Sequence, residues 1–148
     1  MSFQKKIHLI SYLLLLSYLI LGIVIYDDYG ISWDEYFHRI SGFVSLNFFR
    51  ELFGLDIYPG LEHNTDFFKE DTKLYGVLFD LPMAYLEKKL SLTDSQEFYY
   101  LRHFSNFFIF YLSSIFFYLI LRKRFTSLLS LIGLLFWILS PRIFADSF

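Results

Sequence analysis

The feature that most constrains this chain is an uncharged stretch, residues 9–26, that is dense in Leu and Ile. Its length matches the roughly 20 residues that a helix needs to cross the hydrocarbon of a bilayer. Backbone polar groups in hydrocarbon must be satisfied internally, so we predict a membrane-spanning helix here. A cleavable signal peptide is the alternative reading. The stretch is longer than the usual apolar core of about 7–15 residues, however, and no small-x-small cleavage site follows it.

Two further uncharged runs, residues 104–121 and 125–139, follow later in the chain. We therefore predict an all-α membrane protein with three transmembrane helices, at about 9–26, 104–121 and 125–140. Composition agrees, because 55% hydrophobic and 23% aromatic residues in a chain of 148 exceed what one soluble domain can bury. The absence of Cys excludes a disulfide framework, and no run is basic enough to suggest nucleic-acid binding.

Charged residues predict how these spans are oriented. Lys5 and Lys6 precede the first span, and residues 122–124 form a basic turn between the second and third. Residues 27–102 instead hold 14 acidic against 7 basic residues. By the positive-inside rule, we expect a cytoplasmic N-terminus, an outer loop at residues 27–103 and a C-terminus outside. The short basic turn and the lack of a glycosylation sequon in the loop favour a bacterial inner membrane.

The long outer loop is predicted to contain two amphipathic juxtamembrane helices, residues 33–53 and 74–90. Ser32 and Glu35 have capping-box spacing at the start of the first helix, and Thr93 and Gln96 have it before the second span. Asp80, Pro82 and Glu87 interrupt the second apolar stretch, so it reads as an interfacial helix and not as a span. Residues 55–73 contain a Pro-Gly pair and read as an extended loop.

Asp34 and Glu35 are the first candidates for chemistry. They stand in the first turn of a predicted helix, where free amide groups and the helix dipole favour carboxylate anions. An ionised carboxylate at a membrane surface can accept a proton from an acceptor group or hold a divalent cation. Helix capping is the simpler explanation of these acids. Glu35 suffices for the capping box, however, which leaves Asp34 without an evident structural role.

A second polar cluster follows the third span and is expected on the same face of the membrane as Asp34. Arg142 and Asp146 are four residues apart and can pair on one helix face, and Arg suits a phosphate at headgroup level. A membrane-edge anchor with a solvated ion pair is the alternative. Arg102 stands at the outer entrance of the second span, where snorkelling competes with phosphate binding as its role. His38 and His63 are possible metal ligands by type, but the sequence does not fix their partners.

Taken in order, these features resemble the N-terminal part of a GT-C glycosyltransferase of family 39, which includes protein O-mannosyltransferases and lipid A aminoarabinose transferases. In that family a cytoplasmic N-terminus and one span precede a large outer loop that opens on an Asp-Glu pair. Residues 32–36, Ser-Trp-Asp-Glu-Tyr, are similar to that opening. Arg102 resembles an Arg that the family has at the start of its second span. Arg142 and Asp146 resemble an Arg followed by an acid in the family's second outer loop.

The resemblance implies transfer of a hexose or pentose from a polyprenyl-phosphate donor to an acceptor on the non-cytoplasmic face. Asp34 and Glu35 would be catalytic, and Arg102, Arg142 and Asp146 would bind the donor phosphate or the acceptor. The resemblance does not fix a cofactor, and a divalent cation is the candidate because carboxylates can hold one. Because the family is several times longer, the chain is expected to be an N-terminal piece that is inactive by itself. The alternative is a small non-enzymatic membrane protein that binds a partner or assists assembly.

Overall fold

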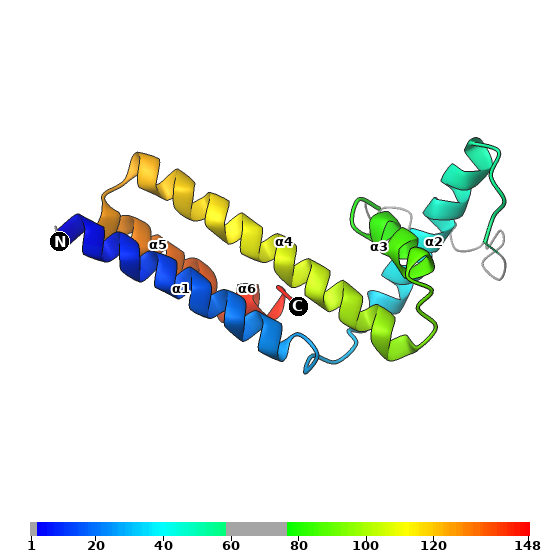
Figure 1. Ribbon diagram of the computed structural model, residues 1–148, viewed down its shortest axis with the longest axis horizontal. Helices are drawn as coiled ribbons and strands as arrows, with labels where there is room; N and C mark the ends of the chain where they lie inside the picture. The colour runs from blue at the N-terminus through cyan, green and yellow to red at the C-terminus, as the bar shows by residue number, and fades with distance from the viewer. Residues whose placement is uncertain (1–2, 59–76) are drawn as a thin grey trace. The chain divides into compact units, whose positions relative to one another are not determined.

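The computed structural model describes residues 3–58 and 77–148, which are helical and contain no strand. The helices are α1 (Phe3–Ile25), α2 (Glu35–Leu52), α3 (Asp80–Lys89), α4 (Ser95–Arg124), α5 (Ser127–Leu139) and α6 (Pro141–Ala145) (Figure 1). The chain divides into two compact units, which we call the helical bundle (Met1–Tyr29 with Arg102–Phe148) and the loop unit (Gly30–Leu101). The predicted all-α class is confirmed for the described residues.

Two of the described helices, α1 with 23 residues and α4 with 30, are long and apolar enough to cross a membrane. Helix α5 is equally apolar but has only 13 residues. At about 1.5 Å per residue it measures roughly 20 Å, which is shorter than a hydrocarbon core of about 30 Å. It stops before Pro141, which disfavours the helical conformation of Ser140. The predicted third span at 125–140 is therefore one short helix followed by a separate turn of helix.

Aromatic and small side chains together fill the interior of the helical bundle. Tyr18, Phe107, Tyr118 and Leu134 are buried in one cluster. A methyl group on Gly22 would lie 1.9 Å from the Phe107 ring, so only glycine lets that ring reach α1. Ser11, Ser114 and Ser130 are fully buried, and each hydroxyl donates to the carbonyl four residues earlier. Small side chains at helix contacts are typical of packing within membranes.

The two ends of the helical bundle are chemically different. At one end His8 lies 3.0 Å from the Tyr118 hydroxyl and 3.2 Å from the Ser127 hydroxyl, and Arg122 donates to the Tyr12 hydroxyl. At the other end the Tyr29 ring stacks on Phe148 at 4.4 Å. Residues 127–148 therefore extend along α1 from one end to the other, although α5 alone is short (Figure 1).

In the loop unit, α2 packs on α3 through the buried residues Phe43, Leu46 and Ala84. The helix predicted at 33–53 is confirmed as α2, which ends just before Gly54, where a φ of 67° favours glycine. The helix predicted at 74–90 is shorter, because α3 begins only at Asp80. Residues 74–76, most of the predicted loop and His63 lie outside the described residues.

The cap predicted for the helix that leads into the second span is placed one residue too early. The carboxylate of Asp94 accepts the backbone N–H of Gln96 at 3.0 Å, and α4 begins at Ser95. Asp94 therefore caps α4 in place of Thr93. Both residue types are good N-caps, so the spacing to Gln96 alone does not decide between them.

Gly42 sets how closely α2 and α3 approach. A methyl group at this position would lie 2.4 Å from the backbone oxygen of Asp80. We expect Gly42→Ala to force the helices apart and to destabilise their contact by about 1–3 kcal/mol. Hydrogen exchange of the α2 and α3 amides measures this effect. The control is Gly30→Ala, which meets no atom within 4 Å, and equal protection in the two variants would contradict the prediction.

Candidate functional site

Asp34 occupies the N-cap position of α2, and 66% of its side chain is exposed. Its carboxylate accepts a hydrogen bond from the Ser32 hydroxyl at 2.9 Å. This bond, assisted by the nearby imidazole of His38, lowers the pKa of Asp34 below its ordinary value. The group is therefore ionised and accessible near neutral pH.

The predicted capping box forms only in part. The Glu35 carboxylate accepts the backbone N–H of Ser32 at 3.2 Å, as a capping box requires. The Ser32 hydroxyl, however, donates to Asp34, and the Asp34 side chain at the N-cap makes no cap hydrogen bond to α2. Asp34 makes no cap hydrogen bond, as the sequence predicted, but its carboxylate does accept from Ser32 and lies beside His38. Glu35 stabilises the turn before α2 by accepting the backbone N–H of Ser32.

His38 lies between two carboxylates of the loop unit. Its Nδ1 is 3.2 Å from Oδ2 of Asp80, whose side chain is only 5% exposed. Its Nε2 is 3.7 Å from Oδ2 of Asp34, one helical turn earlier. The sequence indicated His38 as a candidate without a partner. The structure supplies that partner from α3, 42 residues away.

A second ion pair between the same helices was not predicted. The Arg39 guanidinium binds both carboxylate oxygens of Glu87, with Nε 3.0 Å from Oε2. It also lies over the Phe98 ring, 3.7 Å from the centroid. Asp80 and Glu87 were expected only to keep the apolar stretch at 74–90 from crossing the membrane. They instead face α2 and are buried, and their seven-residue spacing was the available signal that both lie on one helix face.

The three candidates for binding the donor phosphate or the acceptor, Arg102, Arg142 and Asp146, belong to the helical bundle, whereas Asp34 and Glu35 belong to the loop unit. Arg142 and Asp146 form the predicted pair, with Nε 3.8 Å from Oδ2, and their side chains are 92% and 74% exposed. Asn106 donates to the backbone oxygen of Asp146 at 3.2 Å and so attaches this segment to α4. Arg102 is different, because it is only 4% exposed and its guanidinium is not displayed at the surface.

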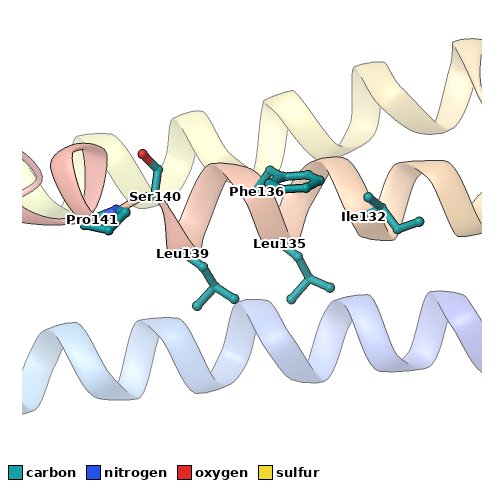
Figure 2. Close-up of a pocket in the computed structure, with 6 residues that line it drawn as sticks. All are labelled: Ile132, Leu135, Phe136, Leu139, Ser140 and Pro141. Carbon is teal, nitrogen blue, oxygen red and sulfur yellow. The ribbon is translucent and has the colours of Figure 1, made fainter.

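An apolar pocket of about 550 Å³ lies where α5 gives way to α6, immediately before Arg142. Four of its six lining residues are apolar side chains of α5, and Ser140 and Pro141 complete it. Figure 2 shows Leu135 and Leu139 pointing toward α1. Arg142 follows the lining residue Pro141 in the sequence, and its side chain is exposed and does not line the pocket.

Metal binding is not indicated in the part of the chain that the structure describes. Within residues 3–58 and 77–148, no three His, Asp or Glu side chains are grouped so as to hold a metal ion. The chemistry that these residues do offer is proton transfer at Asp34 and His38 and anion binding at Arg142.

Comparison of the chain with protein-family models, curated proteins and solved structures finds no match.

Proposed function

We propose that this chain is part of a multi-pass glycosyltransferase of the GT-C type, which transfers a sugar from a polyprenyl-phosphate donor on the non-cytoplasmic face of a cell membrane. The observation that carries the proposal is Asp34, an exposed and ionised carboxylate at the start of an amphipathic helix that follows an apolar span. A base in this place can take the proton of an acceptor hydroxyl as the lipid phosphate leaves. Glu35 supports the same turn.

The donor side of the proposal is supported by the end of α5. A polyprenyl phosphate combines a long apolar chain with an anionic head. The pocket at Leu135, Phe136 and Leu139 suits the chain, and Arg142, the residue after Pro141 at the pocket's edge in the sequence, is of the type that suits the phosphate. Asp146 pairs with Arg142 and would limit how far the Arg142 side chain moves. We assign the phosphate to Arg142 before Arg102, because only Arg142 is exposed.

We infer three spans with the N-terminus in the cytoplasm, and α2 and α3 as juxtamembrane helices. Large apolar side chains cover the outside of α1 and α4, which favours lipid as their surroundings. Residues 127–148 extend along the length of α1, since Ser127 contacts His8 near its start and Phe148 contacts Tyr29 just after its end. The third crossing is therefore α5 together with the segment after it. The basic residues 122–124 lie at the end of the bundle where α1 begins, as the positive-inside rule requires.

This topology predicts opposite accessibility for two engineered cysteines in a chain that has none of its own. In spheroplasts, a membrane-impermeant maleimide should label the Asp28→Cys variant at once. It should label the Phe125→Cys variant only after the membrane is permeabilised. Both positions are exposed in the structure, so burial does not explain a difference. Immediate labelling of both variants would contradict the inferred topology.

Donor turnover tests the proposed activity directly. Membranes that contain the full-length protein are incubated with radiolabelled polyprenyl-phosphate mannose or polyprenyl-phosphate aminoarabinose, and a nucleotide sugar serves as the control donor. We expect sugar transfer from a polyprenyl donor only. Arg142→Ala should raise the KM for that donor by roughly tenfold or more, since a hydrogen bond to a charged group contributes about 1.5–3 kcal/mol. Arg142→Lys should lose less. No turnover of either polyprenyl donor would favour the non-enzymatic alternative.

A further inference from the structure

We propose that the helical bundle binds one anionic phospholipid at its basic end. Arg122 and the neighbouring cations bind the lipid phosphate, and the acyl chains lie against the apolar sides of α1 and α4. The inferred topology places this lipid in the cytoplasmic leaflet. The site is separate from sugar transfer and uses none of the residues assigned to it. All of its residues belong to one compact unit of the chain.

The charge of the helical bundle is divided between its two ends. Five exposed basic residues stand at the start of α1 and in the last turn of α4. They are Lys5, Lys6, Arg122, Lys123 and Arg124. Residues 1–26 and 103–145 contain no Asp or Glu, and the three acids of this unit, at 27, 28 and 146, follow the opposite ends of α1 and α5. The basic end therefore has a strong excess of positive charge.

His8 holds the two basic segments close together. Its ring on α1 lies 3.0 Å from the Tyr118 hydroxyl of α4 and 3.2 Å from the Ser127 hydroxyl of α5. Figure 1 shows the N-terminus and the connection from α4 to α5 at the same end of the bundle. Like charges that packing brings together repel one another, and an anion bound among them relieves that repulsion.

Arg122 is the cation whose position is defined by contacts with two helices. Its Nη1 donates to the Tyr12 hydroxyl of α1 at 2.6 Å. Its guanidinium lies 5.9 Å from the centroid of the Tyr12 ring and 5.8 Å from that of Tyr118. An arginine has five N–H donors, and the Tyr12 hydroxyl uses one of them. The side chain is therefore held in place and can still bind a phosphate through two parallel hydrogen bonds.

Helix dipoles account for only part of this cluster. The negative end of the α4 dipole stabilises the basic residues of its last turn. Lys6 instead stands at the positive end of α1, whose first turn contains no acid. Among the described residues, no carboxylate pairs with Lys6 or with the three cations of α4. An anion from outside the chain is the group that stabilises Lys6 together with Arg122.

The surroundings of the cations favour a phospholipid over a soluble anion. Large apolar side chains are exposed beside the basic residues, and they include Leu9 of α1, Ile120 of α4 and Phe125 directly after α4. Inorganic phosphate or an acidic peptide satisfies the positive charge and leaves these side chains uncovered. A phosphate joined to acyl chains satisfies both parts of the surface, as anionic lipids do at basic sites between membrane helices.

A bound lipid is more than the positive-inside rule requires. That rule concerns the number of basic residues in a loop and needs no lipid to remain attached to them. The structure adds that α1 and α4 contribute to the same basic surface, and that Tyr12 of one helix orients Arg122 of the other. These contacts predict a site with a defined stoichiometry.

Lipid binding to the purified full-length protein tests the site without any sugar transfer, so its result is independent of the proposed function. The delipidated protein in an uncharged detergent is titrated with phosphatidylglycerol or with phosphatidylethanolamine of the same acyl chains, and native mass spectrometry counts the bound lipids. We expect a single phosphatidylglycerol to bind about tenfold or more tightly than phosphatidylethanolamine. Equal affinity for the two lipids would overturn the site. Displacement by excess inorganic phosphate would do the same, since it would show a site for a soluble anion.

Variants at the basic end locate the site. Arg122→Gln should weaken phosphatidylglycerol binding about fivefold or more, which is the usual contribution of one cation near anionic headgroups. Unchanged binding of phosphatidylethanolamine by this variant shows that it folds. Tyr12→Phe should have a smaller effect, because the guanidinium keeps its charge and loses the hydroxyl that orients it.

The matched control is Lys89→Gln, which removes the same charge from an exposed position of the loop unit and should bind both lipids as the wild type does. A wild-type affinity of Arg122→Gln for phosphatidylglycerol would overturn the assignment to the basic end. An equal loss in Lys89→Gln would also overturn it, because the preference would then follow from net charge alone.

Discussion

Asp34→Asn is expected to reduce sugar transfer by about 10²–10⁴-fold, which is the usual contribution of a positioned general base. The amide oxygen of Asn can still accept the Ser32 hydroxyl, so the turn before α2 should survive the substitution. The amide cannot, however, take up the acceptor's proton. The loss should therefore appear in kcat, with little change in the KM for the donor. Initial rates at saturating polyprenyl-phosphate sugar measure it.

The matched control for this prediction is Asp56→Asn. Asp56 is an exposed acid of the same unit, and its carboxylate makes no described contact. Its substitution should leave turnover within about twofold, because exposed sites away from special features change stability by less than about 0.5 kcal/mol. Normal turnover by Asp34→Asn, with normal insertion into the membrane, would remove Asp34 from the catalytic role.

Glu87→Ala should weaken the α2–α3 contact strongly. It leaves the Arg39 guanidinium partly buried between aromatic rings without its carboxylate. Removing one partner of a buried ion pair costs about 3–5 kcal/mol. Amides in α2 and α3 should therefore exchange hydrogen about 100-fold faster or more, since about 1.4 kcal/mol corresponds to a tenfold change in equilibrium. Hydrogen exchange of the intact chain, read by mass spectrometry, measures this.

Two further variants separate the ion pair from general loss of side-chain contacts. Glu51→Ala removes an exposed acid from the end of α2 and should leave exchange unchanged. Combining Arg39→Met with Glu87→Leu removes both charges and should recover much of the protection, because apolar replacement of a whole buried pair is often neutral. If the double variant exchanges as fast as Glu87→Ala, the uncompensated charge is not the cause of the instability.

Helix positions could be predicted from the sequence to the extent that they depend on local properties. Hydropathy over residues 9–26 and 104–121 predicted α1 and the apolar part of α4, because burial of a long uncharged run does not depend on a particular partner. Helical spacing predicted α2 in the same way. Cap positions were less certain, since Thr93 and Asp94 are neighbours with similar capping ability and only one is used.

The candidate site was predictable only in part. Asp34, Arg142 and Asp146 are exposed, and the short-range pair of Arg142 with Asp146 follows from their spacing. Arg102 was expected at the membrane entrance, yet burial removes it from the surface. The α3 partners of His38 and Arg39, Asp80 and Glu87, were not predictable. Both lie on α3, more than 40 residues away, and a single sequence carries no local signal for such contacts.

The sequence by itself determined that this chain builds apolar helices around an acidic segment with an Asp-Glu pair at its start, because charge and hydropathy act residue by residue. Only the tertiary structure decided what that pair contacts. The close approach of α2 and α3 at Gly42 buries Asp80 beside His38, so the imidazole next to Asp34 gains a carboxylate partner that α2 itself does not supply. Side chains far apart in the sequence become one chemical unit only when packing holds them within hydrogen-bond distance.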